Sequence, residues 1–354
     1  MSEQNIKIGP NCFHNCSKLR EFNIPSYITS IGRYAFFDCQ SLVQITIPSS
    51  VKKIRFNAFN NCKALKQVTF VHPSSITKIE QFTFSKCFLL EKITIPSSVK
   101  EIEQYSFDEC LSLAEVSFEK PSSLYSIGER AFLKCTSLTR ITIPSSLHEI
   151  KILAFMSCTS LEEVIFDSPS SIKKIEASVF ANCSSLKKIE IPDSITSLDS
   201  AVFDLCTSLT NILIPNSINL IEYYLFRNCS SLEKIVIPDS VTEIKGSSFL
   251  GCSSLKEITI PDSVKSISDS VFDGCTSLKE IIIPDSVIFI GSYCFKECHA
   301  LEKIKMSCHI RNINSYAFIE CSSLKEITIP NPISTKMYIG VDAFPEHTKV
   351  IYEK

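Results

Sequence analysis

Residues 183–205 read CSSLKKIEIPDSITSLDSAVFDL, and their spacing predicts the local structure. The apolar positions of this stretch are Leu186, Ile189, Ile191, Ile195, Leu198, Val202 and Phe203. Ile189 and Ile191 are two residues apart, which is the period of a strand with one buried face. Pro192 follows at once and ends that strand, because proline has no N–H to donate. The later threefold spacings favour a second extended segment and then a short 3₁₀ or α turn.

The same pattern repeats along nearly the whole chain. A cysteine three residues after a phenylalanine marks each repeat, at Cys16, Cys39, Cys62, Cys87, Cys110, Cys135, Cys158, Cys183, Cys206, Cys229, Cys252, Cys275, Cys298 and Cys321. A unit of this length cannot bury its apolar side alone, but stacked units pair their strands ~4.8 Å apart and bury continuous columns. We therefore predict a solenoid of about fourteen stacked units of 23–25 residues, with a parallel β-sheet face and short 3₁₀ or α turns on the other side.

The repeats leave no stretch for a second domain. We predict a single solenoid over residues 1–354, with an N-terminal cap and partial unit at 1–15, repeats at 16–338 and a C-terminal cap at 339–354. The ends depart from the repeat pattern, as capping units of a solenoid do.

Charge and hydropathy exclude several classes of protein. The 354 residues include 36 Lys and Arg against 38 Asp and Glu, a formal net charge of −2. This balance gives no general attraction for nucleic-acid phosphates or anionic lipid. We find no apolar run long enough to span a bilayer, and the first residues, MSEQNIKIGP, lack the features of a secretory signal. From the residues alone we expect a cytoplasmic protein that has no transmembrane segment and binds no nucleic acid.

The consensus of the units, LxxIxIPxSVxxIxxxAFxxCxxL, resembles the BspA-like leucine-rich repeat. The resemblance covers residues ~8 to 344 and implies a parallel-sheet solenoid. It also implies binding to other proteins or cell surfaces, often as an adhesin or surface-exposed protein of bacteria and protozoan parasites, and no catalytic activity. A peripheral position at the cell surface is therefore the alternative to the cytoplasm.

The 17 cysteines are expected to be free thiols, and the fourteen that mark the repeats are expected to form a buried column. Equivalent side chains of stacked units point the same way, whereas disulfide geometry needs side chains that face each other. Cys12 and Cys294 replace the alanine of the repeat and are expected to be buried, whereas Cys308 follows the strand where Asp or Ser is usual and is expected to be exposed. Two short groups contain metal-ligating residue types, Cys294-x-x-x-Cys298-His299 and Cys308-His309. A zinc site needs four convergent ligands, and Cys294 and Cys298 belong to the core pattern, so we expect no metal.

Motifs of catalysis are missing from the sequence. It contains no Gly-rich phosphate loop, no G-x-S-x-G and no H-E-x-x-H. The acidic and basic residues are distributed along the strands as solvated columns, in which neighbouring units often carry opposite charges. We expect no enzyme, no catalytic residue, no metal and no cofactor.

The outward-facing residue between the two core isoleucines defines a first candidate surface. It is mostly Thr in the N-terminal half, but it is apolar at Ile165, Leu213, Val236 and Ile282, which we call the strand-face strip. The strip is a contact surface, or it reflects only the β-propensity of these residues on an exposed sheet.

A second candidate surface, the aromatic set, comprises Leu220, Tyr223, Tyr224, Ile288, Phe289 and Tyr293. Leu220, Ile288 and Phe289 occupy positions that are polar in most units, and Leu220 and Ile288 are three units apart, ~14 Å. One partner could touch both, and aromatic side chains are frequent anchors of interfaces. This set is a candidate for partner binding or self-association.

A third candidate surface is an edge of the solenoid. Three units have 25 residues because of two-residue insertions, at Val71-His72, Glu119-Lys120 and Asp167-Ser168. They occur in every second unit, so they should bulge from one edge at ~10 Å intervals. We call this the bulged edge; such insertions often lie on a binding face, although neutral drift in length is the alternative.

Two functions remain open. The first is a module for protein recognition or adhesion, and the second is a self-assembling scaffold whose apolar residues form contacts within a homo-oligomer. The mass in solution distinguishes them. An enzyme would need a convergent acid, base or metal site, which the sequence does not reveal.

Overall fold

The structure is a computed structural model that describes residues 6–329 and 337–352. It has two compact units, residues 1–184 (unit 1) and 185–354 (unit 2), which are treated separately below. The outer residues of both predicted caps and the end of the predicted repeat region, at 1–5, 330–336 and 353–354, lie outside the described residues. The division into caps and repeats therefore stays a prediction.

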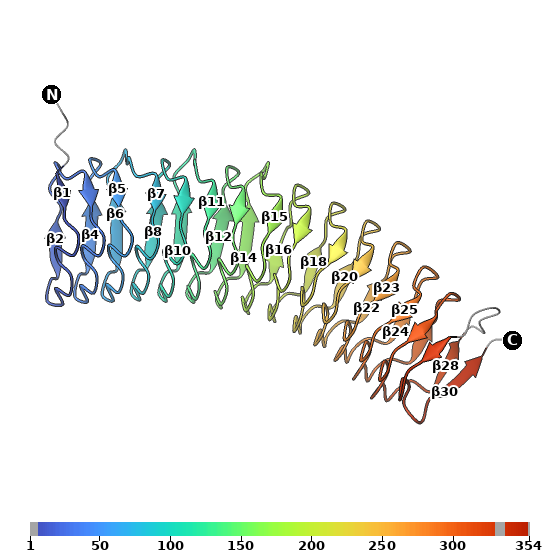
Figure 1. Cartoon of the computed structure of the whole chain (residues 1–354). Helices are drawn as coiled ribbons and strands as arrows, with labels where there is room; N and C mark the ends of the chain where they lie inside the picture. The colour runs from blue at the N-terminus through green and yellow to red at the C-terminus, as the bar shows by residue number, and fades with distance from the viewer. Residues whose placement is uncertain (1–5, 330–336, 353–354) are drawn as a thin grey trace. The chain divides into compact units, whose positions relative to one another are not determined.

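Unit 1 consists of two rows of short parallel strands (Figure 1). The strands before the repeat proline form the front sheet: β2 (Glu21–Asn23), β4 (Gln44–Ile47), β6 (Gln67–Phe70), β8 (Lys92–Ile95), β10 (Glu115–Phe118), β12 (Arg140–Ile143) and β14 (Glu163–Phe166). The strands after the proline form the side row: β1 (Lys7–Ile8), β3 (Ser30–Ile31), β5 (Lys53–Ile54), β7 (Lys78–Ile79), β9 (Glu101–Ile102), β11 (Ser126–Ile127), β13 (Glu149–Ile150) and β15 (Lys174–Ile175). Equivalent residues are partners, as Ile45 is of Val68.

Unit 2 repeats this arrangement. Its front strands are β16 (Lys188–Ile189), β18 (Asn211–Leu213), β20 (Lys234–Val236), β22 (Glu257–Thr259), β24 (Glu280–Ile282), β26 (Lys303–Lys305), β28 (Glu326–Ile329) and β30 (Lys349–Tyr352). Of these, β18, β20 and β22 form one hydrogen-bonded sheet and β24, β26, β28 and β30 another; the two together are called the front sheet of unit 2. Its side strands are β17 (Ser197–Leu198), β19 (Leu220–Ile221), β21 (Glu243–Ile244), β23 (Ser266–Ile267), β25 (Phe289–Ile290), β27 (Asn312–Ile313) and β29 (Tyr338–Ile339). The predicted parallel β-solenoid is confirmed in both units.

The predicted 3₁₀ or α turns are wrong: none of the described residues is helical. In the turn segment that ends at Cys39, Tyr34 and Asp38 have φ of 54° and 59°. These values lie in the left-handed region, which a right-handed helix does not use. The N–H of Cys39 donates to Phe36 in its own unit (3.2 Å), but the N–H of Phe36 donates to Ala58 in the next unit (2.8 Å). Because alternate amides reach the neighbouring unit, the chain forms successive turns instead of a helix.

Stacked phenylalanine rings fill the core. In unit 1 the ring of Phe132 lies 5.1 Å from Phe107 and 5.2 Å from Phe155, almost parallel to both. In unit 2, Phe226, Phe249 and their equivalents stack at similar separations. These side chains are fully buried, so each unit covers the apolar side of the next.

The repeat cysteine links neighbouring units by a hydrogen bond. The thiol of Cys62 donates to the carbonyl oxygen of Phe36 in the preceding unit (3.1 Å), and that of Cys252 donates in the same way to Phe226 (3.1 Å). All cysteines are free, and Cys294 and Cys308 are buried and exposed, as predicted. Cys16 and Cys12 are exposed, against the prediction, because no preceding unit covers them in the described part of the chain.

A first prediction concerns the phenylalanine column. Phe132→Ala should lower the free energy of unfolding by roughly 3–5 kcal/mol, because it opens a cavity between two stacked rings. Hydrogen exchange should show a loss of protection near β12 and a much smaller loss near β2, since each 23–25-residue repeat contacts only the repeats next to it. Tyr125→Ala, on the surface, is the matched control and should cost far less. Uniform loss of protection across unit 1 would contradict this picture.

A second prediction concerns thiol reactivity. At pH 7 a thiol reagent should label Cys12, Cys16 and Cys308 quickly and the buried cysteines slowly. Burial raises the pKa of Cys158 and of Cys252 to about 12, so almost none of the reactive thiolate exists at neutral pH. Mass spectrometry of native and denatured protein after labelling gives the count. Oxidised cysteines before unfolding, or fast labelling of the buried ones, would show that the thiol column is wrong.

Candidate functional site

Three members of the strand-face strip are well exposed on the front sheet of unit 2. The exposed fractions are 77% for Leu213, 54% for Val236 and 62% for Ile282. Leu213 and Val236 are partners on the neighbouring strands β18 and β20, and Val236 is the partner of Thr259 on β22. Ile165, on β14 of unit 1, is only half-buried and is the partner of Thr142. The apolar surface is therefore concentrated on unit 2.

Charged side chains surround the exposed part of the strip. Nζ of Lys234 lies 3.6 Å from a carboxylate oxygen of Glu257, and a carboxylate oxygen of Glu233 lies 2.9 Å from Nζ of Lys256. Both pairs join one repeat to the next. Such exposed pairs contribute little to stability, so they leave both charges available to a partner. A shallow hollow of about 500 Å³ beside Ile282 is bordered by Thr259 and by other side chains of β22, β24 and β26.

The aromatic set does not form one surface. Tyr223, Tyr224, Ile288 and Tyr293 are exposed, whereas Leu220 and Phe289 are half-buried in the side row. The register pairs Leu220 with Glu243 and Ser266 with Phe289, so Leu220 shares its column with Phe289 and not with Ile288.

The tyrosines of this set have partners within the chain. The guanidinium of Arg227 lies 4.8 Å from the ring centre of Tyr224 and also pairs with Asp204, at 2.8 Å from Nε to Oδ1. Tyr293 stacks on Tyr316 with ring centres 5.2 Å apart. Part of the surface of Tyr224 and Tyr293 is therefore covered by side chains of the same chain.

The insertions of the bulged edge contact one another. Nδ1 of His72 lies 3.8 Å from a carboxylate oxygen of Glu119, and Nζ of Lys120 lies 3.4 Å from one of Asp167. Each contact crosses an intervening 23-residue repeat. In the repeat between His72 and Glu119, Ser97 donates its N–H to Glu119 (3.0 Å).

The chain also turns sharply at each insertion. The bonds His72–Pro73, Lys120–Pro121 and Ser168–Pro169 are cis. Val71 and Glu119 still donate their N–H groups to the preceding unit, so the front strand continues into the insertion before the turn.

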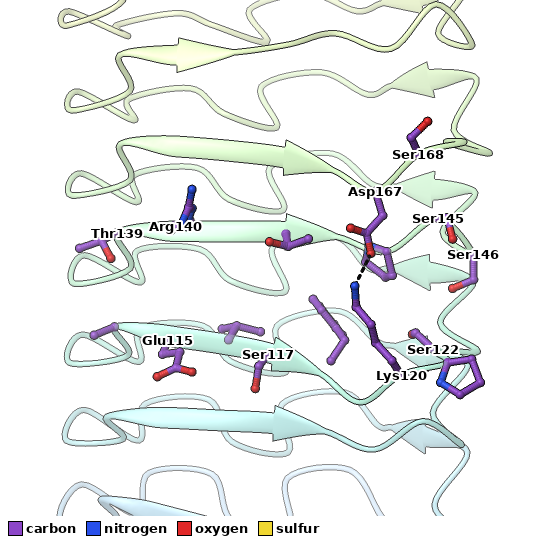
Figure 2. A pocket seen from close by; sticks show the side chains of 16 residues that line it. Glu115, Ser117, Lys120, Ser122, Thr139, Arg140, Ser145, Ser146, Asp167 and Ser168 are labelled. Atoms are coloured by element: carbon purple, nitrogen blue, oxygen red, sulfur yellow. Dashed lines mark ion pairs between the residues drawn. The ribbon is translucent and has the colours of Figure 1, made fainter.

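The bulged edge and the front sheet of unit 1 together form a groove, which the sequence did not reveal (Figure 2). Its volume is about 1020 Å³, and Ser117 and Thr142 of the front sheet are among the residues that line it. Lys120, Asp167 and Ser168 border one side, and the Lys120 side chain points along the groove toward Asp167. The lining is mostly hydroxyl and charged, unlike the apolar strip of unit 2.

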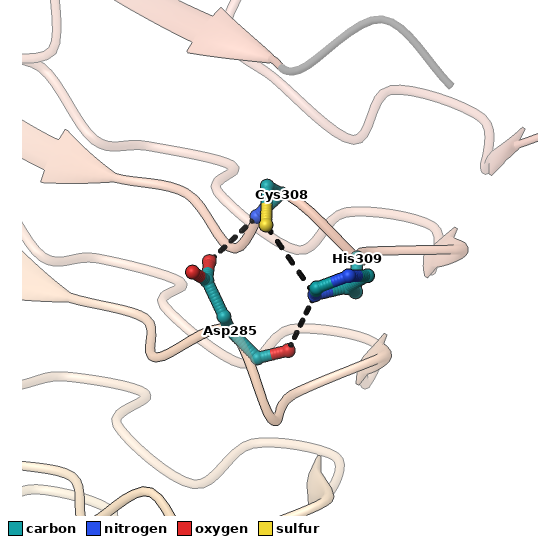
Figure 3. A group of neighbouring side chains, drawn as sticks. All are labelled: Asp285, Cys308 and His309. Atoms are coloured by element: carbon teal, nitrogen blue, oxygen red, sulfur yellow. Dashed lines mark hydrogen bonds between the residues drawn. The ribbon is translucent and has the colours of Figure 1, made fainter. Parts of the chain in front are cut away.

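A second group lies where β24 and β26 end (Figure 3), and of its three residues the sequence singled out Cys308 and His309 but not Asp285. A carboxylate oxygen of Asp285, Sγ of Cys308 and a ring nitrogen of His309 lie within 4.8 Å of one another. All three residues are exposed. Hydrogen bonds from Cys308 lower the pKa of Asp285, so this carboxylate is ionised at neutral pH. The signal for Asp285 is its separation of 23 residues from Cys308, one unit of the repeat.

No described residues form a helix of the length and hydropathy that crossing a bilayer requires. Searching the curated proteins gives no match to this chain. A family model, the BspA type leucine-rich repeat region, matches residues 6–138, 125–256 and 242–351.

Solved structures are similar to this chain as well. A leucine-rich repeat protein from Bacteroides ovatus is 31% identical, with 95% of this chain and 94% of that chain covered and a TM-score of 0.76. A leucine-rich cell surface protein from Faecalibacterium prausnitzii is 30% identical over 81% of this chain and 82% of that chain, with a TM-score of 0.49. The pneumococcal vaccine antigen PcpA shares the fold at 23% identity and a TM-score of 0.55, over 100% of this chain and 91% of that chain. Because the family model matches the chain from residue 6 to residue 351, the chain belongs to the BspA-type leucine-rich repeat family.

Proposed function

We propose that this chain is a non-enzymatic module that recognises another protein through the front sheet of unit 2. The observation that carries the proposal is the exposure of Leu213, Val236 and Ile282 on adjacent or near-adjacent strands. Apolar side chains gathered on an exposed face favour a protein partner, because a partner removes them from water. Leucine-rich repeat proteins are generally protein-binding modules, which supports the same reading.

The arrangement around the strip suits a specific contact. Apolar side chains lie at the centre, and the charged columns that include Lys234 and Glu257 form a polar rim. Many protein interfaces have this pattern, in which the buried centre provides affinity and the charged rim provides orientation. Each apolar side chain that becomes fully buried would contribute roughly 1.5–3 kcal/mol.

We also propose that recognition takes place at a cell surface, as an adhesion or receptor contact. The BspA-type family relationship supports this location and gives no support to the cytoplasmic location expected from the residues alone.

A self-assembling scaffold is the second candidate. Tyr223 and Ile288 are exposed outside the strand-face strip, and two copies of the chain could cover them. This candidate requires a stable homo-oligomer, whereas partner recognition requires only a monomer.

A third prediction tests the strip. The triple variant Leu213→Thr, Val236→Thr and Ile282→Thr should bind intact cells about 100-fold more weakly or worse, since at least two anchors of 1.5–3 kcal/mol are lost. Threonine suits an exposed strand, so the fold should remain. The measurement is binding of the fluorescently labelled protein to washed cells, with circular dichroism as the fold control.

The matched control carries three substitutions in the same column of unit 1, Thr46→Ser, Thr69→Ser and Thr94→Ser, and should bind like the unmodified chain. Equal binding by the strip variant would refute the strip and move the contact to the groove or the bulged edge. Sedimentation of the unmodified chain decides about the scaffold: a stable oligomer that dissociates in Tyr223→Ser with Ile288→Ser would favour self-assembly.

A further inference from the structure

One turn of unit 2 departs from the repeat in its chemistry. In most repeats the turn after the front strand contains Pro and then two polar residues such as Asp285-Ser286 or Ser49-Ser50. After β26 the corresponding residues are Cys308-His309. Two adjacent positions thus carry metal-ligating side chains where the repeat needs only a small polar turn.

Stacking of the units adds a third ligand. Asp285 occupies the position of Cys308 in the preceding unit, and its carboxylate accepts the N–H of Cys308 at 2.9 Å. Sγ of Cys308 lies 3.3 Å from Nδ1 of His309, and that nitrogen lies 3.1 Å from the carbonyl oxygen of Asp285. Figure 3 shows the three side chains converging from two turns. In the described part of the chain, no other group of three such residues brings its ligand atoms this close.

From this geometry we infer that Asp285, Cys308 and His309 form a Zn²⁺ site. Tetrahedral zinc with Zn–S of about 2.3 Å and Zn–N of about 2.0 Å separates the sulfur and nitrogen ligands by ~3.5 Å, close to the observed 3.3 Å. A thiolate with an imidazole favours zinc over magnesium or calcium, which prefer oxygen ligands. Three protein ligands leave the fourth position to water or to a side chain of a bound protein.

Binding has a defined proton balance. The Cys308 thiol loses its proton to solvent, so that the thiolate binds the ion. Nδ1 of His309 binds through its lone pair, so the ring proton lies on Nε2 and the contact with the Asp285 carbonyl is given up. Asp285 contributes an oxygen, and with the thiolate it neutralises the two charges of the ion.

A fourth prediction tests this site with Zn²⁺ alone. After treatment with a chelator, the full chain should bind one Zn²⁺ in a calorimetric titration. Cys308→Ser with His309→Ser places in this turn the Ser-Ser pair that unit 1 has at Ser49-Ser50, so it should fold normally and lose this binding. Asp285→Asn should weaken binding by about 10- to 100-fold or more, since even loss of a group that only orients a ligand has that effect.

The matched control is Cys12→Ser with Cys16→Ser. It removes the other two exposed thiols, which have His14 between them in sequence, and it should leave binding unchanged. With Co²⁺ in place of Zn²⁺, the near-ultraviolet thiolate-to-cobalt band should persist in this control and vanish in Cys308→Ser. No Zn²⁺ binding, binding lost only in the control, or unchanged binding in Asp285→Asn would each overturn the site.

Discussion

The contact between the phenylalanine and cysteine of neighbouring units is the interaction on which the rest of the structure depends. Each ring stacks on the next, and each repeat thiol donates to the carbonyl of the phenylalanine one unit earlier, as Cys62 does to Phe36. The thiol is small enough to be buried, and it gives the phenylalanine carbonyl oxygen a second hydrogen bond. Without the thiol this oxygen would accept only one, from a backbone N–H. Repetition of this contact keeps every unit in the same register, so all other side chains form columns.

Columns explain how the chain forms surfaces. Residues one unit apart in sequence become neighbours, which places Leu213 beside Val236 and Asp285 beside Cys308. The 25-residue repeats alternate with 23-residue repeats, and residues of two successive long repeats contact each other across the short repeat between them, as Lys120 and Asp167 do. A substitution at an outward position changes a surface without disturbing the core, because the core columns use other positions of the unit. The scaffold can therefore vary its binding chemistry along its length.

The front strands of unit 1 and those of unit 2 carry different chemistry. The front sheet of unit 1 is rich in hydroxyl groups and is bordered by the insertions, of which Lys120 and Asp167 form an ion pair beside a groove whose lining residues mostly carry hydroxyl or charged groups. The front sheet of unit 2 carries Leu213, Val236 and Ile282 in the open. The tyrosines that looked like separate anchors in the sequence are partly covered, because Arg227 packs on Tyr224 and Tyr316 on Tyr293.

The repeat made the solenoid, its buried columns and the outward strip predictable, since a period of 23 residues with strand spacing permits few other structures. It could not predict the turns, where left-handed residues such as Tyr34 send amides to the next unit instead of forming a helix. The sequence also predicts an exposed Cys308 next to His309, but it does not reveal a set of convergent metal ligands. Only the stacked structure brings Asp285 to them and joins the bulged edge to the front sheet as a groove, because both depend on how the side chains of stacked repeats are oriented in space.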